Sequence, residues 1–178
     1  MAKNTNKAKK VAVLTSGGDA SGMNACVRAC VRYALDKGYE VFGIKHGYKG
    51  LVNDEIFKME YSSVSNCVHA GGTILRSSRC PEFQEHDVMC AAVENLLKRG
   101  IENLIVIGGD GSFRGVEAIH EGTKLNVIGI PGTIVNDMGY TDSTIGFDTA
   151  CNTVVDAILK LRDTITSHDR IMILEVMG

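Results

Sequence analysis

Near its amino end the chain reads Val11-Ala-Val-Leu-Thr-Ser-Gly-Gly-Asp-Ala-Ser-Gly-Met-Asn24. The four apolar residues 11–14 predict a buried strand, and the segment from about Ser21 to Lys37, closed by Gly38, predicts a helix. A second strand is expected at 40–44. A strand, a glycine-rich turn, a helix and a strand in this order are typical of a right-handed βαβ crossover, in which the two strands are parallel.

The rest of the chain continues this alternation. We expect further strands at 104–107, 127–130 and 171–176, and further helices at 87–99, 112–121 and 148–167. The sequence therefore predicts an α/β fold: a parallel sheet with helices on both faces, a Rossmann-like three-layer sandwich. Because no closing helix follows the last apolar run, we expect the chain to be truncated before a second domain. Residues 1–9 are expected to be a polar N-terminal extension and residues 10–178 the α/β domain.

Composition excludes several classes of protein. The 178 residues suit one domain, and 19 basic against 21 acidic residues give a net charge of −2. Without a global positive field, nucleic acid is not an expected partner. The sequence has neither a signal-peptide apolar region nor 18 consecutive apolar residues, which predicts a cytoplasmic protein that has no membrane partner. The six cysteines are expected to be reduced, structural thiols.

Three glycine-rich loops follow predicted strands. In the first, Gly17 and Gly18 let the backbone approach an anion before a helix start. This loop matches neither the dinucleotide-binding nor the Walker A pattern, so a phosphate cradle and a tight structural turn both remain open. The second loop is Gly108-Gly-Asp-Gly-Ser112, in which Asp110 would sit beside an anion. A carboxylate beside phosphates needs a cation between them, which favours Mg²⁺ with a nucleotide, although Asp110 could instead only cap the helix.

The third loop is Pro131-Gly-Thr-Ile-Val-Asn-Asp137. Thr133, Asn136 and Asp137 offer polar groups where a second substrate could face the nucleotide. Ligands of such sheets bind outside the carboxyl ends of the strands, so the three loops would share one edge. Together they favour phosphoryl transfer, in which the protein positions the reactants and neutralises charge.

These loops belong to a longer series of motifs in a fixed order. The series includes Leu14-Thr-Ser-Gly-Gly-Asp19, Gly71-Gly-Thr73, Arg79-Cys-Pro-Glu-Phe83, Gly108-Gly-Asp-Gly-Ser112, Thr144-Ile-Gly-Phe147 and Glu175-Val-Met-Gly178. With these motifs the chain resembles, from about Lys10 onward, the amino-terminal half of bacterial ATP-dependent 6-phosphofructokinases. The resemblance implies phosphorylation of D-fructose 6-phosphate by ATP to fructose 1,6-bisphosphate in glycolysis, with Mg²⁺ as cofactor.

The resemblance also implies roles for individual residues. Asp110 would bind Mg²⁺, and Thr133 and Asp137 would lie at the transferred phosphoryl group. ATP would be held by Gly18, Tyr48, Arg79, Cys80, Gly109, Asp110, Gly111, Ser112 and Gly115. The substrate site would include Thr133, the Val135 position, Met177, Gly178 and, from a neighbouring subunit, Arg170. Such a shared site implies a homo-oligomer, typically a tetramer.

Arg28, Arg32 and Arg162 match the family's arginines for an allosteric effector, an ADP-type nucleotide or another phosphorylated ligand. The chain departs from the family pattern nearby, where Tyr61 and Asn66 replace an arginine and an aspartate. Arg76 replaces a small or neutral residue near the ATP region. The family's proton-accepting aspartate is replaced by Val135, which cannot accept a proton. The chain could therefore be a non-catalytic, regulatory subunit that binds nucleotide and sugar phosphate; a weaker alternative is a different kinase with the same GGDG element.

Overall fold

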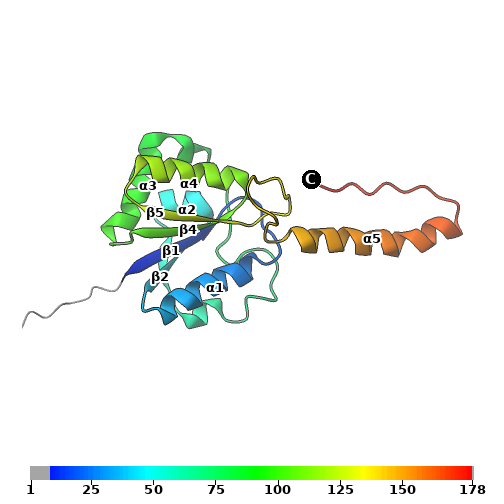
Figure 1. The fold of residues 1–178 in the computed structure, drawn as a ribbon, viewed down its shortest axis with the longest axis horizontal. Helices are drawn as coiled ribbons and strands as arrows, with labels where there is room; N and C mark the ends of the chain where they lie inside the picture. Colours follow the sequence, from blue (N-terminus) through cyan, green and yellow to red (C-terminus); the bar gives the residue numbers. More distant parts are fainter. Residues whose placement is uncertain (1–8, 178) are drawn as a thin grey trace, which may run out of the picture.

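The computed structural model describes residues 9–177; the first eight residues of the expected N-terminal extension and Gly178 lie outside the described residues. Five strands form one sheet in the order β3-β2-β1-β4-β5 (Figure 1). The strands are β1 (Lys10–Thr15), β2 (Glu40–Ile44), β3 (Ile56–Met59), β4 (Asn103–Gly108) and β5 (Asn126–Pro131). The helices are α1 (Met23–Asp36), α2 (Gly47–Val52), α3 (His86–Lys98), α4 (Asp110–Gly122) and α5 (Phe147–Ser167). The α/β fold expected from the sequence is confirmed.

The sheet is parallel except at one edge. β1 pairs in parallel with β2 and with β4, and β4 pairs in parallel with β5, whereas β3 runs antiparallel to β2. The sequence predicts the parallel strands but no strand at 56–59, so the antiparallel β3 is an addition to the expected sheet. Only residues 45–55, which include the short helix α2, join β2 to β3, and a parallel crossover needs a dozen residues or more.

Both faces of the sheet are buried along its central strand β1. Along β1, Ala12 and Leu14 face a core that contains Leu51 of α2, Leu96 of α3 and Ile119 of α4. Val11 and Val13 face the opposite core, which contains Val27 and Val31 of α1. The alternation follows from the period of two in a strand, and because both sets are apolar, helices cover both faces. Figure 1 shows α1 on one side of the sheet and α3 and α4 on the other.

The carboxyl-terminal part of the chain differs from the sequence prediction. No residue of α5 is buried, and the helix projects away from the sheet (Figure 1). The strand expected at 171–176 is wrong, because the described residues after α5 form no regular structure. A strand exists through pairing with a neighbour, and no described strand lies alongside this run, so Ile171 and Ile173 remain 95% and 94% exposed.

Helix length and hydropathy bear on the membrane prediction. Within residues 9–177, no helix is both long enough and apolar enough to cross a membrane.

Candidate active site at the carboxyl edge of the sheet

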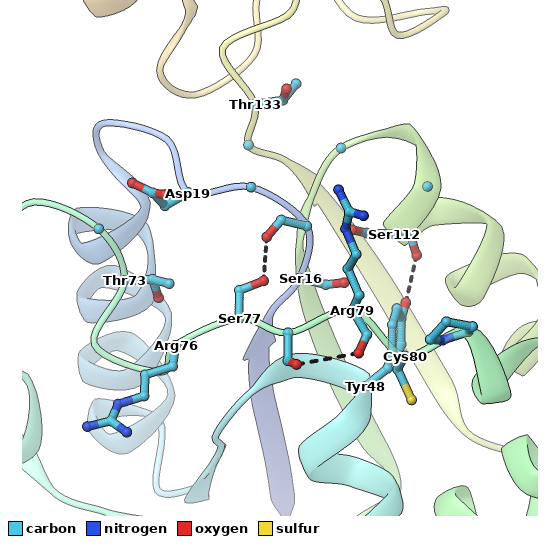
Figure 2. Close-up of a pocket in the computed structure, with 18 of the residues that line it drawn as sticks. Ser16, Asp19, Tyr48, Thr73, Arg76, Ser77, Arg79, Cys80, Ser112 and Thr133 are labelled. Atoms are coloured by element: carbon cyan, nitrogen blue, oxygen red, sulfur yellow. Dashed lines mark hydrogen bonds between the residues drawn. The ribbon is translucent and has the colours of Figure 1, made fainter.

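A cavity of about 910 Å³ lies at the carboxyl ends of β1 and β4. The chain leaves β1 toward β2 on one side and continues from β4 toward β5 on the other, so the loops after these two strands diverge and leave a crevice. All three glycine-rich loops contribute to it, together with the segment 72–84 and Tyr48 from α2 (Figure 2). The structure thus brings together at one edge the loops that the sequence spreads over more than a hundred residues.

Backbone hydrogen bonds fix the glycine-rich loops to one another. The Ser16 amide donates to the Ile107 carbonyl at 2.9 Å, and the Gly132 amide donates to the Gly108 carbonyl at 2.9 Å. A Cβ on Gly108 would lie 2.6 Å from the Ser16 carbonyl oxygen, so only glycine permits this close approach. Gly17 has a φ of +83°, which also favours glycine. The first loop is therefore held against the second by local geometry that other residues cannot adopt without strain.

The segment 72–84 is held over the end of β1 by side chains. The Thr15 hydroxyl lies 2.9 Å from the Thr73 hydroxyl and 2.9 Å from the Arg76 carbonyl oxygen. The Ser77 hydroxyl donates to the Gly17 carbonyl (Figure 2). Buried Asn24 donates to the Ala70 carbonyl at 3.0 Å and accepts the Ile74 amide at 2.8 Å. These bonds position Arg79 and Cys80 at the cavity.

Tyr48 forms one wall of the cavity. Its ring stacks on Phe83 with centroids 4.3 Å apart, and its hydroxyl donates to the Ser112 carbonyl at 2.6 Å (Figure 2). Burial raises the pKa of Tyr48 well above its usual value, so the hydroxyl remains protonated and continues to donate. Gly115 lies directly behind this ring and outside the cavity lining. The contact that the structure gives Gly115 is therefore with Tyr48.

Replacing Gly115 with alanine is expected to displace the Tyr48 ring. The new Cβ would lie 2.6 Å from the Tyr48 hydroxyl oxygen and ring, closer than real carbon contacts. Overpacking of this kind costs roughly 1–3 kcal/mol of stability. We expect Gly115→Ala to lower the midpoint of urea unfolding and to weaken ATP binding, both measured on the purified protein. Gly38→Ala, far from the cavity, is the control for stability alone, because Gly38 has a φ of +78° and alanine is strained there although nothing lies within 4 Å. Unchanged ATP affinity in a destabilised Gly115→Ala protein would contradict a role for Tyr48 in the site.

The cavity combines positive charge with glycine surfaces. Arg76 and Arg79 line it, and Asp19 is the one carboxylate among the described lining residues. A Cβ on Gly18 or Gly111 would meet nothing within 4 Å, so both glycines leave open space rather than serving the packing. The lining is thus suited to an anion that lies close to the backbone.

Arg76 and Cys80 also line the cavity. Arg76 has a φ of +60°, which is uncommon for a residue with a side chain, and its exposed guanidinium points away from the other labelled lining side chains in Figure 2. Partial burial is the main cause that raises the pKa of the Cys80 thiol, so Cys80 is a neutral wall at physiological pH.

The third loop is fixed by its own side chains. The Thr133 hydroxyl accepts the Val135 amide at 3.2 Å, and the Thr144 hydroxyl donates to the Thr133 carbonyl at 2.8 Å. Asn136 donates to the Asp142 carbonyl at 3.1 Å and accepts the Thr144 amide at 3.0 Å. Thr133 lines the cavity, whereas half-buried Val135 and exposed Asp137 lie outside its lining. No carboxylate of this loop therefore lines the cavity.

Asp110, the expected metal ligand, does not itself line the cavity but lies between the lining glycines Gly109 and Gly111. Asp110 is in the first turn of α4, its side chain is exposed, and it pairs with Arg114. Among the described residues, no three His, Cys, Asp or Glu side chains gather as a metal site. A single carboxylate beside a phosphate-sized space fits Mg²⁺, which is usually held by one or two carboxylates together with the phosphates of a nucleotide.

The other expected site residues lie elsewhere in the chain. Arg28 and Arg32 are on α1, where Arg28 donates to the Val64 carbonyl at 2.6 Å and the Arg32 guanidinium lies 5.5 Å from the centre of the Tyr61 ring. Arg162, on the projecting α5, is not brought to them within one chain. Exposed Arg170 and Met177 follow α5, and Gly178 lies outside the described residues.

Several lining residues escaped the sequence analysis as individual candidates. They are Ser16, Asp19, Thr73, Ser77, Ser78, Pro81 and Gln84. Most of them belong to the motifs quoted above or lie next to those motifs. Their closeness in sequence to Arg79 and to the first glycine-rich loop could have marked them as candidate lining residues. These residues come together because the segment 72–84 folds over the end of β1. The spacing of residues in the sequence does not reveal that fold.

A cavity outside the carboxyl ends of parallel strands, where the strand order reverses, defines the class: an open α/β protein that binds ligands at its switch point. A family model described as phosphofructokinase matches residues 10–178. The chain belongs to the phosphofructokinase family, as the resemblance implied.

Individual relatives agree with this membership. The chain is 58% identical over 170 residues to the ATP-dependent 6-phosphofructokinase of Clostridium botulinum (strain Eklund 17B / Type B), a match that covers 96% of this chain and 53% of that protein. It is also 58% identical over 171 residues to the protein of the same name from Staphylococcus aureus (strain JH9), with the same coverage. The chain thus spans about half the length of the curated relatives it matches.

Solved structures give the same fold. The structure of phosphofructokinase from Saccharomyces cerevisiae superimposes with a TM-score of 0.83 at 35% identity, over 90% of this chain and 25% of that chain. A pyrophosphate-dependent phosphofructokinase from Marinobacter aquaeolei superimposes with a TM-score of 0.75 at 20% identity, over 89% of this chain and 42% of that one. The second comparison bears on the fold alone.

Proposed function

We propose that this protein transfers the terminal phosphoryl group of ATP to the 1-hydroxyl of D-fructose 6-phosphate, giving fructose 1,6-bisphosphate and ADP. The observation that carries the proposal is the glycine-lined cavity at the β1 and β4 loops, in a chain 58% identical to proteins named ATP-dependent 6-phosphofructokinase. Gly111 and Gly132 also match the ATP-using branch of the family, since pyrophosphate-using relatives typically carry Asp and Lys there.

The cavity supports binding of a triphosphate. Gly109 is the N-cap of α4 and Gly111 lies in its first turn, and the amino end of a helix attracts phosphate oxygens. Arg79 adds a fixed positive charge, and Tyr48, with Cys80 and Phe83 beside it, offers a less polar wall suited to the nucleoside. The side-chain-free surfaces of Gly18 and Gly111 let the phosphates approach the backbone.

Asp110 is the residue proposed to hold Mg²⁺. When bound, Mg²⁺ would neutralise charge on the phosphate oxygens. Phosphate oxygens and water would supply the remaining ligands, as Mg²⁺ prefers.

Thr133 and the loop behind it would position the sugar. Its hydroxyl lines the cavity, and its backbone is held by Thr144 and Ile145. For an in-line transfer, the sugar oxygen forms a bond to the terminal phosphorus while the bond to the ADP oxygen breaks. The hydroxyl proton leaves late in a loose transition state and can pass to solvent when no side chain accepts it.

A second function is favoured by Val135: a non-catalytic subunit that binds nucleotide and sugar phosphate. No carboxylate of the loop 131–137 lines the cavity, so this loop offers no proton acceptor for general-base assistance, which is worth roughly 10²–10⁴ in rate. The binding surfaces do not depend on Val135. This reading predicts normal ATP binding with negligible turnover.

One pair of measurements separates the two functions. Calorimetric titration with ATP and Mg²⁺ measures binding, and an assay that couples fructose 1,6-bisphosphate to NADH oxidation measures turnover. Binding with sustained, ATP-dependent product formation supports the kinase, whereas binding without product above background supports the regulatory subunit. Absence of ATP binding contradicts both.

Residues outside the cavity would take part in assembly and regulation. Arg170 would reach the sugar phosphate of a neighbouring subunit in a homo-oligomer, a tetramer by family resemblance, in the cytoplasm. Arg28 and Arg32 lie on one helix and would bind a phosphorylated effector or an ADP-type nucleotide together with Arg162 from another part of the assembly. Sedimentation of the full-length protein with and without ADP tests the oligomeric state and its response.

A further inference from the structure

The residue proposed to bind magnesium already has a cation beside it. Arg114 lies one helical turn after Asp110 on α4, and its Nη2 atom is 3.1 Å from the Asp110 Oδ2 atom. Both side chains are largely exposed, at 80% for Arg114 and 62% for Asp110. The pair therefore lies at the amino end of α4, beside the glycines that line the cavity.

The sequence favours this pair. An acidic residue four positions before a basic one is the better orientation for an ion pair on a helix surface. The helix dipole at the amino end of α4 stabilises the Asp110 carboxylate but does not stabilise a cation in the following turn. Arg114 therefore lies toward the helix start because it pairs with Asp110. Arg114 is thereby placed at the oxygens that a metal ion would use.

We propose that Arg114 competes with Mg²⁺ for Asp110 and so sets the magnesium concentration at which the nucleotide binds. The inference rests on the proposed function, because it takes Asp110 as the metal-holding residue. A guanidinium at 3.1 Å and a divalent cation on the same carboxylate repel each other, so Arg114 must move away, or be held less closely, when the metal binds.

The expected size of the effect follows from the exposure of the pair. Exposed ion pairs four residues apart on a helix contribute little, and breaking one changes an equilibrium about twofold. Removing Arg114 should therefore tighten magnesium binding by that factor. Salt screens exposed charges, so the difference between the two proteins should shrink as potassium chloride is raised toward about 1 M.

The test is a calorimetric titration with a non-hydrolysable ATP analogue at a series of free magnesium concentrations. Arg114→Met keeps a long apolar stem and removes the charge. We expect its magnesium midpoint to be about twofold lower than that of the unmodified protein, with analogue binding unchanged at saturating magnesium. The matched control is Lys98→Met, which removes the same charge from the Lys98–Glu94 pair on α3, 3.2 Å apart and also four residues apart. Its midpoint should equal that of the unmodified protein.

Other results would overturn the inference. An unchanged midpoint in Arg114→Met, or an equal shift in Lys98→Met, would show that Arg114 does not compete specifically. Weaker analogue binding in Arg114→Met without magnesium would make Arg114 a phosphate ligand instead. If the unmodified protein binds the analogue with no dependence on magnesium, the metal role in the proposed function fails as well, and that failure is recognisable because it appears before any substitution is made.

Discussion

The Val135→Asp protein is expected to form fructose 1,6-bisphosphate about 10²–10⁴ times faster than the unmodified protein. Val135 lies half-buried two residues beyond Thr133, in a loop held by Thr144 and Asn136, so a carboxylate there would have a fixed backbone beneath it. It would accept the sugar hydroxyl proton during transfer. The measurement is the initial rate of the coupled assay on the full-length protein, together with the ATP affinity by calorimetry, which should not change.

Val135→Asn is the matched control for that rate. Asparagine has nearly the same shape and polarity as aspartate but cannot accept the proton at neutral pH. We expect it to leave the rate at the level of the unmodified protein. Equal acceleration by both substitutions would assign the gain to polarity or loop packing, and no acceleration by Val135→Asp would show that a missing base is not what limits turnover.

The Gly111→Asp protein is expected to lose ATP affinity by about 100-fold or more while keeping its thermal stability. A Cβ on Gly111 meets nothing within 4 Å, so the fold accommodates a side chain there. Its carboxylate, however, would enter the space proposed for the phosphates, and two like charges about 4 Å apart near a protein surface repel by about 4 kcal/mol. Calorimetric titration with ATP and Mg²⁺ measures the affinity, and a thermal melt measures the stability.

Gly139→Asp controls for the added charge. Gly139 also has open space around it, but it lies outside the cavity lining, so the same charge change should leave ATP affinity within about twofold. If Gly111→Asp binds ATP as tightly as Gly139→Asp does, the phosphates do not lie at the start of α4. That result would remove the main support for the nucleotide site while leaving the fold untouched.

In the third glycine-rich loop, residues 131–137, the sequence predicts the position of the loop but not which of its side chains face the cavity. The motif 131–137 predicts a loop at the carboxyl edge, and Thr133 does line the cavity. Asp137 is an equally plausible polar candidate in the sequence, yet it is exposed and outside the lining. Hydrogen bonds between Asn136 and residues 142–144 close the loop on itself, and these contacts set which side chains face inward.

Local patterns of the sequence determined the strands and helices that form the sandwich. The apolar runs at 11–14 and 104–107 alternate between two cores, and glycines mark the turns at the carboxyl ends of β1 and β4. Such features act over a few residues, through period and backbone freedom, so they can be read without knowing what packs against them. The three glycine-rich loops could likewise be located from the sequence alone.

Contacts between distant segments decided the rest. The run 171–176 has the composition of a strand but lacks a neighbour to pair with, and β3 turned antiparallel because its connection is short. The covering of β1 by residues 72–84, and the pairing of Arg114 with the proposed metal carboxylate, depend on where side chains meet in space. Hydrogen bonds and ion pairs require a partner at a particular distance and angle, and the position of that partner is a property of the folded chain.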